Sequence, residues 1–197
     1  MSERQRRMID EAEKSCARWV AIVSEMSDIG KLDSGAITLA QHPLDLFSLL
    51  AQVAELVHEA SDRNVHLKLI GASHGANING DAPRLRTAFD ALFRAILREQ
   101  QGPSTVVAER RRETRDGQAC AVLIVAAEGS VQEAYDRKSG PFDDTRGGMG
   151  LALPLARRVI EGHGGRIWSP AAATTGGPHA SDPLARGSVV ISFPIRS

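Results

Sequence analysis

The stretch from Arg146 to Trp168 constrains the fold more than any other part of this 197-residue chain. It reads RGGMGLALPLARRVIEGHGGRIW, so closely spaced glycines lead into an apolar helical pattern, and a later glycine pair separates that pattern from a strand. Glycine adopts the left-handed backbone of tight turns, and free amides at a helix start attract phosphate. The stretch therefore predicts a turn, a helix and a strand in the arrangement that a phosphate-binding loop needs.

The rest of the chain predicts a long helix followed by a layered α/β domain. Apolar periodicity and capping residues predict helices over 3–33, 46–61, 80–100 and 150–162. Alternating or apolar runs predict strands over 65–71, 104–113, 118–129, 165–169 and 188–194. The segments 128–147 and 169–188 lack a clean period; the first is interpreted as a loop or lid and the second as a loop.

This order predicts a two-layer α/β sandwich, in which a mixed sheet is covered by the helices near 46–60, 83–99 and 151–162. The long N-terminal helix is expected to project as a separate element, with Gly35 at its C-terminal cap. The predicted domain organisation is a helix over 1–35 and an α/β domain over 36–197.

The N-terminal helix carries an apolar stripe that one helix cannot bury alone. Ile9, Cys16, Trp19, Val23 and Met26 recur at steps of three, four or seven residues. The stripe predicts a homodimer or a partner helix on this face.

Composition excludes several classes of function. The 24 basic and 24 acidic residues balance, so no excess positive charge is available for nucleic acid or an anionic membrane. The polar N-terminus is unlike a signal peptide, and no apolar run approaches the length of a membrane span. Cys16 and Cys120 are far apart and have no metal-ligand spacing. The chain is expected to be cytoplasmic, with no membrane contact.

GGMGLALPLARRVIEGHGGRIW and RGSVVISFP, together with HPLDLFSLL and GDAPRLRTAF, occur in the order and spacing of a known family. The chain resembles the C-terminal ATP-binding part of sensor histidine kinases, over nearly its whole length. The resemblance implies a histidine-kinase-like ATPase fold, and it makes 8–35 similar to the second helix of the dimerisation hairpin. It also implies ATP and Mg²⁺ as cofactors, and a response regulator or another kinase as partner.

The helix that carries the family's two asparagines departs from the family pattern. Counting from Asp81, Arg84 and Leu85, the asparagine positions fall on Ala91 and Ala95. The resemblance implies that the second position should ligate Mg²⁺ through a side-chain oxygen, which alanine lacks. Glu99, one turn further on, could compensate, although a solvated helix end is the preferred interpretation.

The first glycine box also departs from the family pattern. The family reads Asp-x-Gly-x-Gly, and this chain has Ala127, Gly129 and Val131 at those positions. The aspartate should accept a hydrogen bond from the adenine amino group, and Ala127 removes it. Glu128 is interpreted as a surface residue, because neighbouring strand residues point to opposite faces.

The second glycine box is the best-matched part of the site. Gly148, Gly150 and Leu151 match it, and Ser188 falls where the family commonly has Thr or Ser near the phosphates. These residues and Gly129 form the candidate site for nucleotide or phosphate, with no metal ligand and no catalytic residue predicted. The alternative is that the glycines serve only the turn and that Ser188 is a strand-edge hydroxyl.

None of the histidines is predicted to act in catalysis. The family's phosphoacceptor histidine lies on a first dimerisation helix, and no histidine precedes His42 in this sequence. His58, next to Glu59, is interpreted as a half-exposed helix residue, and His163 as a structural residue at a helix end. His66, His74 and His179 form no metal-ligand pattern.

Three functions remain open. The first is a signalling module that is degenerate in ATP and Mg²⁺ binding and inactive alone. The second is an active kinase domain that phosphorylates a histidine on another helix or chain. The third, a phosphotransfer protein, needs an acceptor histidine on the dimerisation helices, and the predicted N-terminal helix has none.

Overall fold

A computed structural model describes residues 2–58, 63–115, 117–172 and 182–195. The helices are α1 (Glu3–Asp33), α2 (Leu46–Leu56), α3 (Ala82–Glu99), α4 (Val131–Asp136), α5 (Ala152–Gly162) and α6 (Pro183–Gly187), with 3-10 turns η2 (Glu128–Ser130) and η3 (Arg146–Gly148). The strands are β1 (His42–Asp45), β2 (Val65–Gly71), β3 (Asn77–Gly80), β4 (Ser104–Arg115), β5 (Gln118–Ala127), β6 (Ser139–Gly140), β7 (Arg166–Pro170) and β8 (Val189–Pro194).

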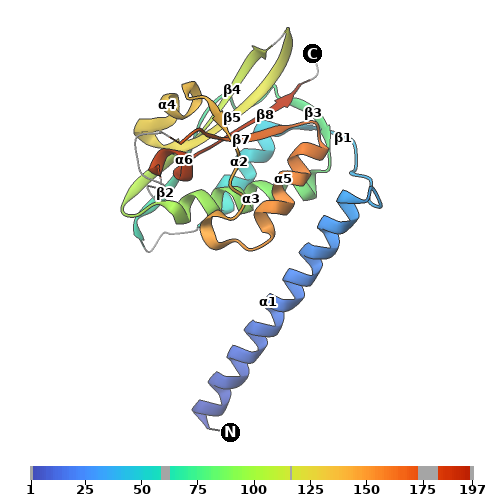
Figure 1. Ribbon diagram of the computed structural model, residues 1–197, viewed down its shortest axis with the longest axis vertical. Helices are drawn as coiled ribbons and strands as arrows, with labels where there is room; N and C mark the ends of the chain where they lie inside the picture. Colours follow the sequence, from blue (N-terminus) through green and yellow to red (C-terminus); the bar gives the residue numbers. More distant parts are fainter. Residues whose placement is uncertain (1, 59–62, 116, 173–181, 196–197) are drawn as a thin grey trace.

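The main sheet has six strands in the order β2-β4-β5-β8-β7-β6. The β2–β4 pair is parallel and the other pairs are antiparallel. Helices α2, α3 and α5 lie on one side of this sheet (Figure 1), and their buried residues join those of the strands in one core. The predicted two-layer sandwich with a mixed sheet is confirmed.

Strand β5 shows why a second apolar cluster forms on the other face of the sheet. Its residues Ala121, Leu123 and Val125 belong to the main core. The alternate residues Val122, Ile124 and Ala126 point to the opposite face, where they are also buried. The strand therefore needs a cover on both faces.

Helix α4 supplies part of that second cover, and the sequence did not predict it. Val131 and Ala134 are buried in the second cluster, and Tyr135 packs against it. The interpretation of 128–147 as loop was therefore wrong over Val131–Asp136. A six-residue helix spans less than two turns, which is too short for a periodic pattern to be recognised.

Three other features differ from the sequence prediction. Helix α2 ends at Leu56, because Val57 has an extended backbone, whereas the sequence predicted helix to about Ser61; residues 59–62 are outside the described part. The segment 169–188, predicted as loop, contains the short helix α6, capped by Asp182. Strands β1 and β3 pair with each other, a long-range pairing that local patterns do not reveal.

Helix α1 projects from the domain as predicted (Figure 1). Ser2 and Gln5 form a capping box at its start, and Gly35, with a φ of +68°, follows its end. No residue of α1 is buried. Its last turns touch the domain through ion pairs from Asp28 to Arg84 and from Asp33 to Arg158. Within the described residues, no helix combines the length and the apolar character that crossing a membrane requires.

Candidate functional site

The start of α3 is held by polar contacts that serve the fold. The Asp81 side chain accepts a hydrogen bond from the amide of Arg84 at 3.2 Å, which is an N-cap. The Asp81 amide donates to Nε2 of His163 at 2.8 Å, and Nδ1 of His163 lies 2.6 Å from the carbonyl of Val159. His163 is therefore the structural helix-end residue that the sequence predicted, and it joins α5 to α3.

The C-terminal half of α3 meets the glycine-rich turn. Ala91 and Ala95 are both buried there. A Cβ added to Gly147 would lie 2.8 Å from Cα of Ala95, closer than real Cβ atoms approach other atoms. The backbone of Gly147 therefore rests directly on Ala95, at the position where the family pattern has its metal-binding asparagine.

The turn itself requires glycine. Gly147, Gly148 and Gly150 have φ values of +65°, +61° and +59°, and side chains destabilise this left-handed conformation. Helix α5 begins after Leu151 without a side-chain cap. Its first turn contains Pro154, which has no N–H to donate, so the helix start offers fewer amides than an ordinary phosphate-binding helix.

Gly147 is bound to α3 through both of its backbone polar groups. Its amide donates to Oε1 of Glu99 at 2.8 Å, and its carbonyl accepts from Nη1 of Arg98 at 3.4 Å. The Glu99 carboxylate also pairs with Arg186, with Nε 3.0 Å from Oε2. The interpretation of Glu99 as a solvated helix end was wrong: its side chain is only 13 % exposed, because the turn folds over it.

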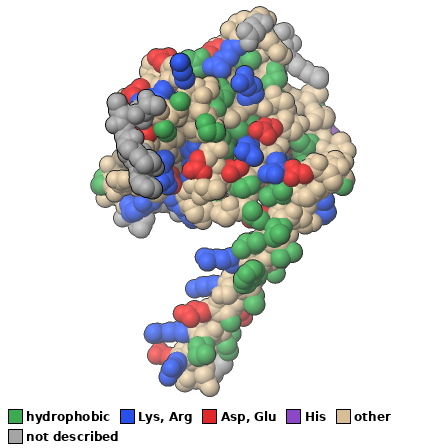
Figure 2. All heavy atoms as spheres, in the orientation of Figure 1, with side chains coloured by type: hydrophobic (Ala, Val, Ile, Leu, Met, Phe, Trp, Pro, Cys, Tyr) green, Lys and Arg blue, Asp and Glu red, His purple; other side chains and the backbone are tan. Residues whose placement is uncertain are grey.

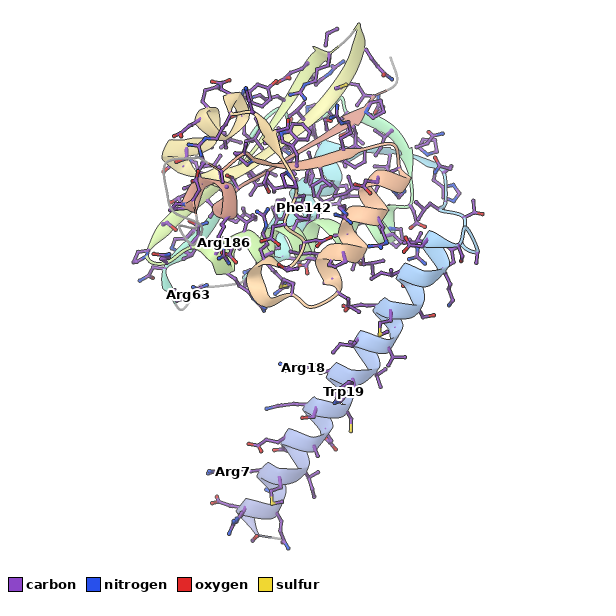
Figure 3. The ribbon with its side chains drawn as sticks, viewed as in Figure 1. Arg7, Arg18, Trp19, Arg63, Phe142 and Arg186 are labelled. Atoms are coloured by element: carbon purple, nitrogen blue, oxygen red, sulfur yellow. The ribbon has the colours of Figure 1, made fainter. Side chains whose placement is uncertain are left out.

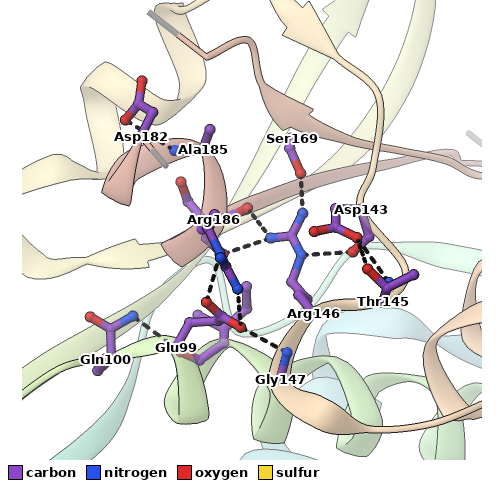
Figure 4. A network of polar contacts seen from close by, with 12 residues as sticks. Glu99, Gln100, Asp143, Thr145, Arg146, Gly147, Ser169, Asp182, Ala185 and Arg186 are labelled. Carbon is purple, nitrogen blue, oxygen red and sulfur yellow. Dashed lines mark hydrogen bonds and ion pairs between the residues drawn. The ribbon is translucent and has the colours of Figure 1, made fainter. Parts of the chain in front are cut away.

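Arg146, the residue before Gly147, is the central donor of this region (Figure 4). Nε donates to the carbonyl of Asp143 at 2.8 Å, and Nη1 donates to the carbonyls of Arg186 and Ser188 at 2.9 and 2.8 Å. Nη2 donates to the hydroxyl of Ser169. The guanidinium group therefore ties the glycine-rich turn to β7, α6 and the start of β8.

The sequence does not reveal the role of Arg146, because an arginine beside glycines usually indicates an exposed loop. In the structure it is 2 % exposed, and its guanidinium stacks on the ring of Phe142 with a separation of 4.8 Å. Burial lowers the pKa of Arg146, while the nearby carboxylates of Asp143 and Glu99 act in the opposite direction. Carbonyl acceptors and these two charges together compensate for the buried cation.

The contacts of Ser188 are internal to the chain. The residue is fully buried, its hydroxyl donates to the carbonyl of Leu184, and its own carbonyl accepts from Arg146. These contacts correspond to the structural alternative for Ser188, because the hydroxyl already has a partner.

The first glycine box lies at the same end of the sheet. Val125 pairs with Val189, so the end of β5 at Ala127 is close to Ser188, the residue that precedes β8. Gly129 is in the turn η2. Val131 starts α4 and is buried in the second apolar cluster. Glu128 pairs with Lys68 at 3.0 Å, and both side chains are more than half exposed, which confirms its prediction as a surface residue.

Among the described residues, the remaining candidates form no second site. His58 is exposed and lies beyond the end of α2, so its interpretation as a helix residue was wrong; Glu59 and His179 are outside the described residues. Both cysteines are free. Over the described ranges, no group of three or more His, Cys, Asp or Glu side chains could hold a metal ion.

The structure has a cleft beside the glycine-rich turn and a groove along α1. A cleft of about 620 Å³ opens beside the turn, and its charged lining residues are Arg63, Arg98, Glu99 and Arg186. A groove of about 550 Å³ separates α1 from α3 and α5, with apolar walls that include Pro83 and Leu155. The arginine-lined cleft is the one that adjoins the candidate nucleotide site.

The fold is that of histidine kinase catalytic domains. The chain superposes over its full length on 40 % of full-length ShkA, solved in complex with AMPPNP, with a TM-score of 0.67 and 19 % identity. It also superposes over 93 % of its length on 84 % of the Acinetobacter baumannii histidine kinase AdeS, with a TM-score of 0.58 and 12 % identity. Comparison with models of known protein families finds no match.

The curated relatives include a signal transduction histidine-protein kinase and proteins named as sensor proteins. The chain is 26 % identical over 174 residues to the signal transduction histidine-protein kinase BarA of Escherichia coli (strain K12), covering 83 % of this chain and 19 % of BarA. It is 32 % identical over 136 residues to the sensor protein CutS of Streptomyces coelicolor, covering 64 % of this chain and 31 % of CutS. The chain thus resembles the ATP-binding part of sensor histidine kinases in sequence and in fold, and it spans less than a third of these relatives.

Proposed function

We propose that the chain is a two-component signalling module that binds ATP weakly, does not turn it over, and acts through its surfaces. The observation that carries this proposal is the contact of Gly147 with Ala95. The position expected to ligate Mg²⁺ has no side-chain oxygen, and backbone covers it. The residues present therefore do not suit a magnesium–nucleotide complex.

The first glycine box supports the same proposal. Ala127 cannot accept a hydrogen bond from adenine, and an unpartnered buried polar edge costs about 1–3 kcal/mol. Val131 stands in place of a glycine and is buried in the second apolar cluster. Together with the loss at Ala95, a few kcal/mol corresponds to an affinity lower by about a hundredfold or more.

The alternative is an active kinase domain that phosphorylates a histidine on another helix or chain. The name of the relative BarA, a signal transduction histidine-protein kinase, favours it. Phosphoryl transfer, however, depends on a metal ion and on precise positioning of the phosphates. Neither Ala95 nor the hydrogen-bonded Ser188 provides these functions.

Calorimetric titration of the purified chain with ATP and Mg²⁺ tests the proposal. We expect no binding in the micromolar range, and no autophosphorylation. The double variant Ala95→Asn and Ala127→Asp should bind more tightly than the wild type, whereas the surface variant Glu128→Gln should behave like it. Micromolar affinity of the wild type, or phosphorylation with this chain as the only catalyst, would contradict the proposal.

We further propose that α1 is a dimerisation helix over 1–35, distinct from the ATPase-like domain over 36–197, and that it pairs with α1 of a second copy. Trp19, Val23 and Met26 are 68, 62 and 60 % exposed. At about 100° per residue, they face away from Ser24 and Asp28, which border the groove toward the domain. The stripe therefore cannot be covered by the chain's own domain (Figure 2).

Light scattering tests this association, and a monomer at all accessible concentrations would contradict it. A cytoplasmic location and a response regulator or another kinase as partner belong to the same proposal. The proposed partner is supported by the signal transduction histidine-protein kinase BarA among the relatives.

A further inference from the structure

The Glu99 carboxylate occupies a position that would suit an external anion. It accepts the amide of Gly147 at 2.8 Å, and it receives Nε and Nη2 of Arg186 at 3.0 and 3.3 Å. A backbone amide of a glycine turn together with an arginine is the donor set that proteins use for phosphate groups. Here a side chain of the same domain satisfies both donors (Figure 4).

We propose that Glu99 is a built-in anion that holds the glycine-rich turn closed on α3, in place of a phosphate group. This inference rests on the proposed function, in which the site is degenerate. It adds a second reason for weak nucleotide binding. Besides the missing ligands, the Glu99 carboxylate competes with a phosphate group for the hydrogen-bond donors that remain.

Three residues of α3 form the surface on which the turn docks. Ala95, Arg98 and Glu99 follow each other at i, i+3 and i+4, so they share one face of the helix. Ala95 leaves room for the backbone of Gly147, Arg98 binds its carbonyl, and Glu99 binds its amide. A longer side chain at position 95 would displace the turn from this face of α3 and open the site.

Arg146 supports the closed turn from the other side. Its Nη1 donates to the carbonyl of Arg186, the residue whose side chain binds Glu99. The contacts therefore form a ring: Glu99 binds Arg186, and Arg186 binds Arg146. Arg146 is followed in sequence by Gly147, which binds Glu99. Opening the turn requires several of these contacts to break together.

The charge of the arginine-lined cleft explains why the Glu99 carboxylate would hinder the binding of an external anion. Three arginines and one glutamate line it, and Arg63 and Arg186 both come from outside α3 (Figure 3). Without Glu99, every charged side chain of the cleft would be cationic, and the nearby amide of Gly147 would lose its acceptor. Such a site attracts inorganic anions.

The test uses Glu99→Ala and Glu99→Gln in the full chain, with Asp90→Ala as the control. Asp90 forms an ion pair with Arg94 on the same helix, so the control also removes a charged pair from α3. Amide hydrogen exchange at Gly147 should be about tenfold to a hundredfold faster in Glu99→Ala, because a charge-assisted hydrogen bond is lost. It should be about fivefold faster in Glu99→Gln and unchanged in the control.

Pyrophosphate then tests whether the freed donors take an anion. Millimolar pyrophosphate should shift the Gly147 amide resonance in Glu99→Ala and leave it unchanged in the wild type. Exchange within about twofold of the wild type in both Glu99 variants would overturn the proposal. Faster exchange at Gly147 without any response to pyrophosphate would also overturn it. If Glu99→Ala does not fold, the same exchange criterion applied to Glu99→Gln decides.

These outcomes are separate from those of the proposed function. Tight ATP binding by the wild type would contradict the degenerate site, whereas unchanged exchange at Gly147 would contradict only the role of Glu99.

Discussion

Helices α1 and α3 are both amphipathic, yet the structure uses them in opposite ways. Helix α1 has 31 residues and none of them is buried, whereas nine of the 18 residues of α3 are buried. The apolar face of α3 meets the sheet and two other helices in the main core. An apolar stripe thus shows that a helix needs a cover, and only the arrangement of the other elements shows whether the chain supplies it.

The largest difference is expected for truncation of an aromatic side chain. Phe89 of α3 is fully buried and its ring centroid lies 6.3 Å from that of Phe193. Phe89→Ala should lower the free energy of unfolding by about 3–5 kcal/mol. Trp19→Ala on α1 should change it by less than about 0.5 kcal/mol in dilute solution, where the chain is monomeric. Urea denaturation measures both, and equal effects would show that α1 packs on its own domain.

Dimerisation, unlike folding stability, should depend on the apolar stripe of α1. Val23→Asp places a charge in the apolar stripe and should weaken dimerisation by about tenfold to a hundredfold, because about 1.5–3 kcal/mol of side-chain burial is lost. Ala17→Asp makes the same change of charge on another face of α1, so it should have little effect. Sedimentation equilibrium distinguishes the two variants, and similar losses in both would indicate a general effect of charge.

The N-caps of the two helices provide a smaller test. Asp81 caps α3 and also accepts the amide of Ala40 at 3.3 Å, so Asp81→Ala should cost about 1–2 kcal/mol of stability. Ser2→Ala removes the cap of α1, but that end frays without affecting the core, and the cost should be below about 0.5 kcal/mol. Chemical denaturation measures both, and a large cost for Ser2→Ala would contradict the view of α1 as an independent element.

The smallest expected effect concerns the junction between α1 and the domain. Hydrogen bonds from Arg158 lower the pKa of Asp33, so the contact should be present above the ordinary pKa of a carboxyl group and be lost as the pH falls through the lowered pKa. NMR titration should show that Arg158→Gln returns the pKa of Asp33 toward its ordinary value. The pKa of Glu25, which burial raises, should not respond.

The helix boundaries that are set by local chemistry could be predicted. Gly35 follows the end of α1 in the left-handed conformation, as predicted, and Ser2 and Asp81 are residues of the type that commonly cap helices. A cap depends on residues within one turn. Helix α4 and the β1–β3 pair could not be predicted, since each is stabilised by residues distant in the sequence.

For the candidate site, the sequence by itself determined which groups are absent: Ala95 and Ala127 have no polar atoms in their side chains, whatever the fold. It also determined the left-handed turn at Gly147 and Gly148, because glycine favours that backbone. Only the tertiary structure decided that Arg146 is buried and that Glu99 binds the turn. The physical reason is that their partners come from β7, α6 and η3, and the distance between such groups is set by packing rather than by their spacing along the chain.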